Sequence, residues 1–193
     1  MSISKGNTKL GRIPNISLPP IKSCKHCKHC KNDCYALKAY KMYKVTRESW
    51  DNNLSLAKKD IVKYMINIVE YLDKHYPTFF RWHVSGDIIN QEYYDYIEHI
   101  AAVFPSIKFL VFTKEYQIDF KIDSKPANLS VVFSAWPTMP DNEIRYDLPI
   151  SWMQDGTEAR IPDNALVCPG NCETCGMCFS LSSIGRDVYF LKH

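Results

Sequence analysis

Residues 79–112 read FFRWHVSGDIINQEYYDYIEHIAAVFPSIKFLVF, and this stretch decides the fold. It contains two short apolar runs typical of buried strands, at 79–84 and 107–112, with a helical pattern over 91–104 between them. A strand, a helix and a strand in this order form a unit whose two strands are parallel and joined by a right-handed crossover. A third apolar run follows at 129–135. The sequence therefore predicts an α/β fold, either an incomplete barrel or an open, mainly parallel sheet with helical crossovers.

The segments on either side of this unit differ in composition. Residues 1–23 are rich in glycine, proline, asparagine and serine, which predicts an extended arm across the body of the protein. A helical pattern runs over 33–75 and ends before Pro77, while prolines after Trp136 separate short candidate strands. With 193 residues, of which 46% are hydrophobic, the chain fits a single domain spanning residues 1–193.

The eight cysteines of the chain fall into two short runs near its two ends. Neither core packing nor disulfide pairing explains gaps of only two and three residues, whereas a metal needs several thiolates that converge on one point. We therefore predict that segments 24–34 and 165–180 bind metal and tie the two chain ends to the fold. The predicted ligands are Cys24, Cys27, Cys30, Cys34, Cys168, Cys172, Cys175 and Cys178.

The spacing of the cysteines favours iron–sulfur clusters over other metals. The first run has the gap pattern of bacterial ferredoxins, and the second contains the three-then-two spacing of radical S-adenosylmethionine enzymes. Both patterns predict a 4Fe-4S cluster. Zinc is the alternative, because Cys27 and Cys30 together with Cys172 and Cys175 would supply a four-thiolate tetrahedron. The first run also contains two histidines that could ligate a metal or remain solvated, His26 and His29.

Polar residues follow two of the predicted strands at the points where these end. Ser85, Gly86 and Asp87 come after the first strand, and Lys114 comes after the second. The carboxyl ends of parallel strands share one edge of a sheet, where binding sites gather. A glycine there lets the backbone approach a ligand, and a carboxylate accepts hydrogen bonds from an amine or hydroxyl. We therefore predict a cofactor site formed by Ser85, Gly86, Asp87, His83 and Lys114. Two alternatives stay open: Asp87 could cap the following helix, and His83 could be a core histidine.

The positive charge of the chain is local. A net charge of +3 does not by itself indicate a nucleic-acid partner. Cations nevertheless cluster in one segment, at Lys38, Lys41, Lys44 and Arg47. They either contact the phosphates of a nucleic acid or form a solvated face. The sequence contains no stretch of about 18 apolar residues and no recognisable signal peptide, so we expect a cytoplasmic protein without a membrane partner.

Several short motifs follow one another in a characteristic order. They are Gly6-Asn7-x-Lys9-Leu10-Gly11, Leu18-Pro19-Pro20, Cys30-x3-Cys34-Tyr35-Ala36, Phe80-Arg81-Trp82-His83-x-Ser85-Gly86-Asp87, and Cys168-Pro169 with Cys172-x2-Cys175-Gly176-x-Cys178 before His193. In order and spacing these motifs resemble the bacteriophage gene product 88 family, over nearly the whole chain. The resemblance implies a phage or mobile-element protein located in the cytoplasm of the host cell.

This family is in turn similar to a trimmed radical S-adenosylmethionine barrel. The similarity implies that segment 30–36 and the turn at 85–87 stand where those enzymes hold their cluster and the amino group of the cofactor. S-adenosylmethionine is therefore a candidate cofactor.

Three kinds of function follow from these observations. The first is an iron–sulfur protein with a radical-SAM-like core and redox or radical chemistry at the strand ends. The second is a zinc-stabilised module that binds nucleic acid or protein. The third is an electron-transfer or redox-sensing protein with closed clusters. An open coordination position on one metal would favour the first of these functions.

Overall fold

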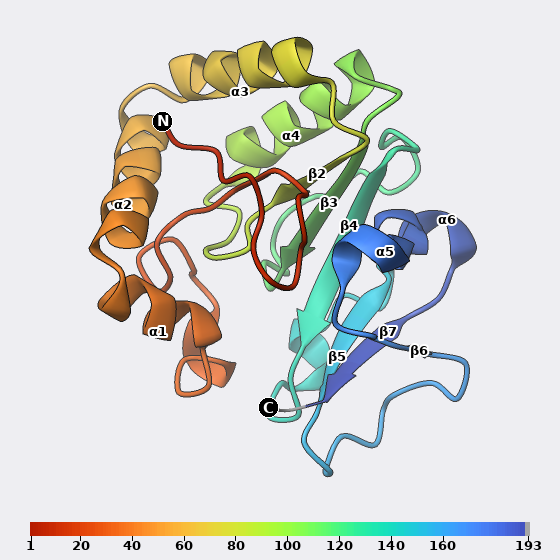
Figure 1. The fold of residues 1–193 in the computed structure, drawn as a ribbon. Helices are drawn as coiled ribbons and strands as arrows, with labels where there is room; N and C mark the ends of the chain where they lie inside the picture. Colours follow the sequence, from red (N-terminus) through yellow and green to blue (C-terminus); the bar gives the residue numbers. More distant parts are fainter. Residues whose placement is uncertain (192–193) are drawn as a thin grey trace.

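The computed structural model describes residues 1–191, so that His193 lies outside it, and its centre is a sheet of seven strands (Figure 1). All neighbouring strands are parallel, in the order β1-β2-β3-β4-β5-β7-β6. The strands are β1 (Asn15–Ile16), β2 (Phe79–Trp82), β3 (Lys108–Thr113), β4 (Leu129–Ala135), β5 (Ile150–Gln154), β6 (Leu166–Val167) and β7 (Val188–Leu191). The predicted α/β fold is confirmed, in its open-sheet form.

Three helices precede β2, and a fourth joins β2 to β3. They are α1 (Tyr35–Met42), α2 (Lys44–Lys59), α3 (Ile61–His75) and α4 (Gln91–Val103). The helical pattern over 33–75 is thus interrupted at Tyr43 and at Asp60, which caps α3 by accepting a hydrogen bond from the Lys63 amide at 2.9 Å.

The remaining helical segments are short. Beyond β5 lie α5 (Cys172–Cys175) and α6 (Leu181–Ile184), and single 3-10 turns occur at Cys27–His29, Asp141–Glu143 and Met177–Ser180. The segment between β3 and β4 contains no helix. No helix within residues 1–191 is both long and apolar enough to span a membrane.

One face of the sheet packs against α2, α3 and α4, and we call it the helical face. Because successive side chains of a strand point to opposite faces, every second residue of β2, β3 and β4 is buried on this side. These strand residues are Phe80, Trp82, Phe109, Val111, Leu129, Val131 and Phe133. They meet Leu54 of α2, Leu72 of α3 and Ile97 of α4. The predicted unit of β2, α4 and β3 therefore forms the centre of this core.

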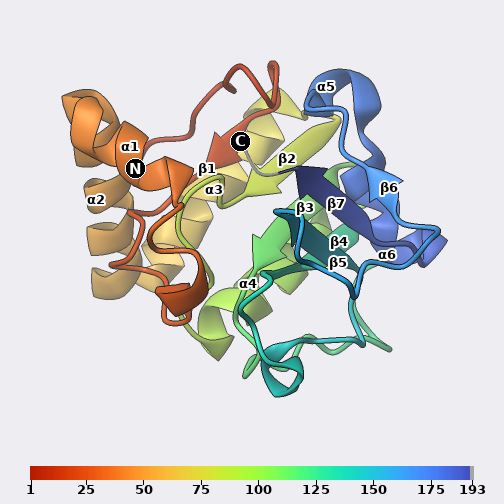
Figure 2. The ribbon, with the colours of Figure 1, turned by 90° about the horizontal axis from the view of Figure 1, so that it is seen from below.

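The opposite face, which we call the arm face, has a different cover. The N-terminal arm and the chain after β6 lie on it, and Figure 2 shows α5 and α6 on the side of the sheet away from α2, α3 and α4. The arm contains β1, which pairs with β2 at the edge of the sheet. The smaller core of this face consists of Leu110, Val132 and Val188 of the strands, Leu10 and Ile13 of the arm, and Phe179 and Leu181 of the C-terminal segment.

Candidate functional site

The turn after β2 is joined to the end of β3 through one carboxylate. Asp87 Oδ1 accepts hydrogen bonds from the Thr113 hydroxyl at 2.7 Å and from the Ile88 amide at 2.8 Å. Asp87 Oδ2 accepts a third from the Lys114 amide at 2.9 Å. The structure therefore brings Asp87 and Lys114 together at the carboxyl ends of neighbouring parallel strands, where the sequence analysis expected a site.

Asp87 is not the cap of the following helix. Asn90 is that cap, because its side chain accepts a hydrogen bond from the Tyr93 amide at 2.9 Å. A carboxylate can accept about four hydrogen bonds, and the described residues donate three to Asp87, one of them to Oδ2. Burial raises the pKa of Asp87, and the Lys114 ammonium and the three hydrogen bonds oppose this.

The arm lies directly over Gly86. This residue has a φ of +84°, and a Cβ added there would lie 2.6 Å from both the Leu18 Cβ and the Ser23 Oγ. The Leu18 amide also donates to the Ser85 carbonyl at 2.9 Å. Glycine is thus required for the approach of the arm, which takes the space above it. Ser85 is buried, and its hydroxyl has no hydrogen-bond partner within the described chain.

His83 belongs to the core of the helical face. It has a φ of +55°, a left-handed conformation just after the last residue of β2, Trp82. His83 Nε2 lies 3.1 Å from the Tyr93 hydroxyl, which lies 3.1 Å from that of Tyr64. Burial lowers the pKa of His83 to about 3, so the ring is neutral at neutral pH. Of the two interpretations that the sequence allowed, the structure favours the core histidine.

The first cysteine run lies against the loops that follow β3 and β4. His26 Nε2 lies 3.3 Å from Glu115 Oε2, and burial raises the pKa of Glu115 to about 7. His29 Nδ1 lies 3.0 Å from the Thr138 hydroxyl, and His29 Nε2 lies 3.1 Å from Glu143 Oε2. Both histidines of the run therefore contact neighbouring loops, and neither is simply solvated.

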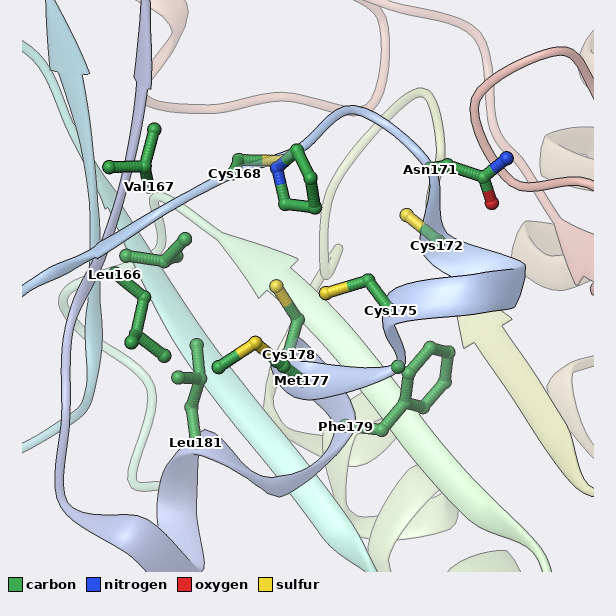
Figure 3. Close-up of a pocket in the computed structure, with 13 residues that line it drawn as sticks. Leu166, Val167, Cys168, Asn171, Cys172, Cys175, Met177, Cys178, Phe179 and Leu181 are labelled. Atoms are coloured by element: carbon green, nitrogen blue, oxygen red, sulfur yellow. The ribbon is translucent and has the colours of Figure 1, made fainter.

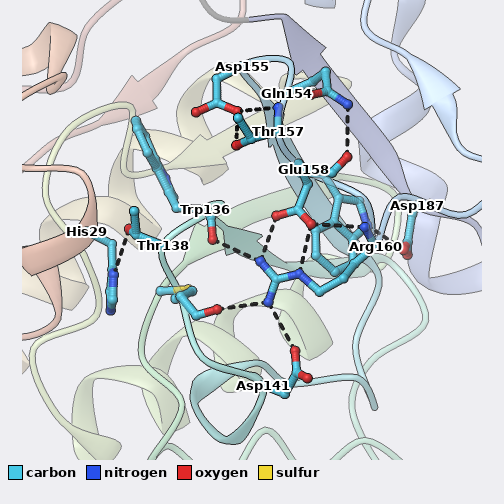
Figure 4. Close-up of polar contacts among 12 residues, drawn as sticks. His29, Trp136, Thr138, Asp141, Gln154, Asp155, Thr157, Glu158, Arg160 and Asp187 are labelled. Atoms are coloured by element: carbon cyan, nitrogen blue, oxygen red, sulfur yellow. Dashed lines mark hydrogen bonds and ion pairs between the residues drawn. The ribbon is translucent and has the colours of Figure 1, made fainter.

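One arginine holds the loop after β4 in place (Figure 4). Arg160 donates to the Met139 carbonyl at 2.8 Å and to the Trp136 carbonyl at 3.2 Å, both in the loop after β4. It also pairs with Glu158 at 2.6 Å. The same loop carries Thr138, so the arginine fixes a contact of the first cysteine run.

Lys114 is the cation at this end of the sheet. Its ammonium lies 5.9 Å from the centre of the Trp136 ring. Burial lowers the pKa of Lys114, but the charges of Cys30, Asp87 and other acidic groups nearby outweigh this and raise it. Burial raises the pKa of the Cys24 thiol to about 12, and the Asp87 carboxylate adds to the effect. The Lys114 ammonium therefore interacts electrostatically with both the Asp87 carboxylate and the thiols of the first run.

The second cysteine run forms a separate group on the arm face. Its four cysteines line one pocket, and Figure 3 shows the sulfur atoms of Cys172, Cys175 and Cys178 directed toward the same space. The Cys172 amide donates to the Lys9 carbonyl of the arm at 2.8 Å. Burial raises the pKa of Cys178 to about 12, and the other thiols of this run add to the effect. Each run thus forms its own group of thiols.

Arg81 of β2 is a buried cation on the arm face. Its guanidinium lies 4.7 Å from the centre of the Phe112 ring, and its Nε lacks a hydrogen-bond partner in residues 1–191. No acidic side chain of the described residues forms an ion pair with it. Burial raises the pKa values of Cys172 and Cys178, and the charge of Arg81 opposes this. The arm face therefore combines four thiols with a buried cation that has no ion pair among the described residues.

The thiols are not arranged as a ready metal site. Within residues 1–191, no three cysteine, histidine, aspartate or glutamate side chains are placed to hold one metal ion, and all eight cysteines are free thiols. The chemistry of the donors nevertheless fits a thiolate-bound metal, because each run provides four thiols beside one cation of the sheet. Metal binding by the two runs stays a prediction.

Several residues of the site carry little signal in the sequence. Glu115, Thr138 and Glu143 lie in loops, and only the fold brings them to the first run. Arg160 is the last residue of one of the short candidate strands after Trp136, at 157–160, and this strand does not form. The sequence does carry a signal for Arg81, because a charged residue inside a strand that is expected to be buried requires a partner of opposite charge.

Comparison with known protein families accounts for most of the chain. A family model described as Gene product 88 matches residues 1–155. The chain belongs to the Gene product 88 family. The matched part of the chain includes the arm, the first cysteine run and the turn after β2, whereas the second run lies beyond it. No curated protein and no solved structure matches the chain, so the similarity to radical S-adenosylmethionine barrels stays an implication of the sequence.

Proposed function

We propose that this member of the Gene product 88 family is an iron–sulfur protein with two separate centres, one in each cysteine run. The first centre serves redox or radical chemistry at the carboxyl ends of β2 and β3, and the second holds the chain end on the arm face. The observation that carries the proposal is Arg81, a buried cation beside Cys172 and Cys178 that has no acidic partner among the described residues.

The charge of a thiolate-bound centre would explain this arginine. Moving an unpaired charge from water into a protein costs several kcal/mol, so a buried arginine requires a negative partner. Neutral thiols do not supply one, and burial raises the pKa values of Cys172 and Cys178. A metal centre with four thiolate ligands carries a net negative charge, which Arg81 would offset at short range. Lys114, whose pKa the charges of Cys30 and Asp87 raise, would offset the charge of the first centre, where the enzyme function requires one iron without a thiolate ligand.

Polar groups for a small-molecule cofactor lie beside the first run. The Asp87 carboxylate suits the amino group of S-adenosylmethionine, and Lys114 suits the carboxylate of the same molecule. An iron–sulfur cluster supplies one-electron chemistry when it is bound. The residues of this chain would orient the cofactor and offset the charge of the cluster. The arm packed over Gly86 would keep water from one side of the site.

Metal analysis of protein prepared without oxygen tests the proposal. We expect brown protein that absorbs broadly near about 400 nm and contains iron and acid-labile sulfide. Cys30→Ser and Cys178→Ser should each remove about half of the iron, because each disrupts one of two similar centres. Met177→Leu is the matched control, since it removes a sulfur from the same pocket without removing a thiol. A colourless protein with stoichiometric zinc would contradict the iron–sulfur assignment and favour the zinc-stabilised module.

The cofactor is tested separately on the reduced protein. S-adenosylmethionine should change the electron paramagnetic resonance signal of the cluster, and Asp87→Asn should weaken this response. Asp95→Asn is the control, because Asp95 lies on α4 and its carboxylate pairs with Lys121 and not with the turn. If the wild-type signal does not respond while the cluster stays intact, the enzyme function is excluded and the closed-cluster electron-transfer function is retained.

A further inference from the structure

The surface around α1 combines cations with exposed aromatic rings. A pocket of about 440 Å³ opens there, lined by Lys31, Asn32, Cys34, Leu37, Lys38 and Lys41. Lys44, the first residue of α2, continues the row of cations, and each of these lysines is exposed. We define the α1 surface as Lys31, Tyr35, Lys38, Lys41, Tyr43 and Lys44.

The lysines of the α1 surface are poorly neutralised by the protein itself. Neither Lys38 nor Lys41 forms an ion pair with any residue of 1–191. Lys44 reaches Glu48 at 3.7 Å, but both side chains are exposed, and such a pair is weak in water. The pocket therefore presents positive charge that is available to an external anion.

Two exposed tyrosines lie at the two ends of α1. Tyr35 is the first residue of α1 and Tyr43 follows its last, and the two are 67% and 57% exposed. The Tyr35 hydroxyl donates to the Val84 carbonyl, which fixes the ring while leaving it open to solvent. The helix separates the two residues by about 12 Å along its axis, a distance that a few nucleotides of an extended strand would cover. Exposed rings beside cations are the usual platform for unpaired bases, because the rings stack on the bases and the cations bind the phosphates.

We infer that the α1 surface binds single-stranded nucleic acid, with Lys38 and Lys41 on the phosphates and Tyr35 and Tyr43 against the bases. A duplex would offer the same phosphates, but its bases are already stacked and could not use the rings. An anionic membrane is the competing partner, because Met42 and Val45 are also exposed nearby. The lysine-lined pocket favours a chain of phosphates over a flat lipid surface. The inference does not depend on which metal the first run binds.

Fluorescence anisotropy with a labelled oligothymidylate tests this inference across a range of salt concentrations. The double variant Lys38→Ala/Lys41→Ala should weaken binding about tenfold at low salt. It should also make the fall of log K with log salt concentration less steep by about 1.4, because each phosphate contact to a single strand contributes about 0.7. Tyr43→Leu should weaken binding about fivefold or more, since it keeps an apolar side chain but removes the stacking ring. The matched control Lys58→Ala/Lys59→Ala removes the same charge from the other end of α2 and should bind as the wild type does.

Three outcomes would overturn the inference. The wild type could fail to bind the oligonucleotide at low salt, or the control pair could weaken binding as much as the α1 pair does. In the third outcome, the wild type binds vesicles that contain phosphatidylserine but not the oligonucleotide, and the Tyr43→Leu variant binds these vesicles at least as well as the wild type. This outcome would assign the surface to a membrane. Circular dichroism and metal content measured on the same samples separate a loss of binding from a loss of fold or of the first centre.

Discussion

The two faces of the sheet are buried in different ways. On the helical face, the long helices α2, α3 and α4 lie across the strands (Figure 1). On the arm face, the cover is an arm with a two-residue strand and a C-terminal segment whose helices have four residues each. Ordering such irregular segments costs conformational entropy that a small apolar core offsets poorly. The difference indicates that the arm face needs a further source of stability, which a metal bound by the second run would supply.

The cover of the arm face also joins the two chain ends. Gly11 of the arm has a φ of +64°, and a Cβ added there would lie 2.0 Å from Glu173 Oε2 of α5. Beside it, the Cys172 amide donates to the Lys9 carbonyl at 2.8 Å. The arm lies within the family match, and the C-terminal segment lies outside it. These contacts make each half of the cover depend on the other.

The largest effect is expected on the helical face. Phe133 is fully buried in its core, so Phe133→Ala should lower the free energy of unfolding by about 3–5 kcal/mol through lost burial and an open cavity. Urea unfolding measures this loss, which should be the same with metal present and after chelation. Val103→Ala, at an exposed position of α4, is the control. A loss that changed on chelation would show that the two faces are not independent.

The next largest effect is expected on the arm face and should depend on metal. Cys172→Ser should remove metal from the second centre and lower Tm by about 5–10 °C, since 1 kcal/mol corresponds to about 2–4 °C in a chain of this size. Differential scanning calorimetry and metal analysis on the same sample check both changes. After chelation, the variant and the wild type should melt together.

The matched comparison is Cys27→Ser in the first run. This run contacts loops at the strand ends and does not cover the core of the arm face, so its loss of metal should change Tm less. Equal changes in Tm for the two variants would contradict a special role of metal on the arm face.

The helical face could be predicted from the sequence because its pattern is periodic. Ile68 and Leu72 recur at helical spacing in α3, and the expected strands at 79–84 and 107–112 lie within two residues of β2 and β3. The arm face could be predicted only in part. Its strand residues lie within visible apolar runs, but neither the arm nor the cysteine segment has a period that identifies what it covers.

The candidate site divides in the same way. The meeting of Asp87 with Lys114 follows from parallel strands, which place their carboxyl ends at one edge. The position of His83 does not follow, because its left-handed backbone breaks the alternation of the strand just before the turn. Contacts such as that of His29 with Glu143 join loops distant in sequence, and no local pattern encodes them.

Acid should weaken the helical face through His83. Burial lowers its pKa from 6.5 to about 3, so between these values the unfolded chain binds a proton that the folded protein does not. The stability is therefore complete above the unfolded pKa and falls as the pH decreases, by about 2 kcal/mol at about pH 5.

His83→Asn isolates this effect, because asparagine tolerates a left-handed backbone and does not titrate. The variant should be less stable than the wild type at neutral pH, yet it should lose about 2 kcal/mol less between neutral pH and about pH 5. Urea titrations at several pH values measure the difference. Parallel stability curves for the two proteins would show that His83 is not the group responsible.

The smallest effect is expected from an ion pair that joins the two halves of the arm-face cover. Arg12 Nε lies 3.1 Å from Glu173 Oε1, but the Arg12 side chain is 92% exposed. Because water and salt screen such a pair, Arg12→Ala should lower Tm by at most about 2 °C, and by less at high salt. Glu173→Ala should lower it further, since Glu173 Oε2 also accepts a hydrogen bond from the Arg12 amide at 3.2 Å. Lys5→Ala, at an exposed position of the same arm, is the control. If Arg12→Ala lowered Tm as much as the loss of a thiol from the second run, charge would hold the two chain ends together, and the arm face would no longer require a metal.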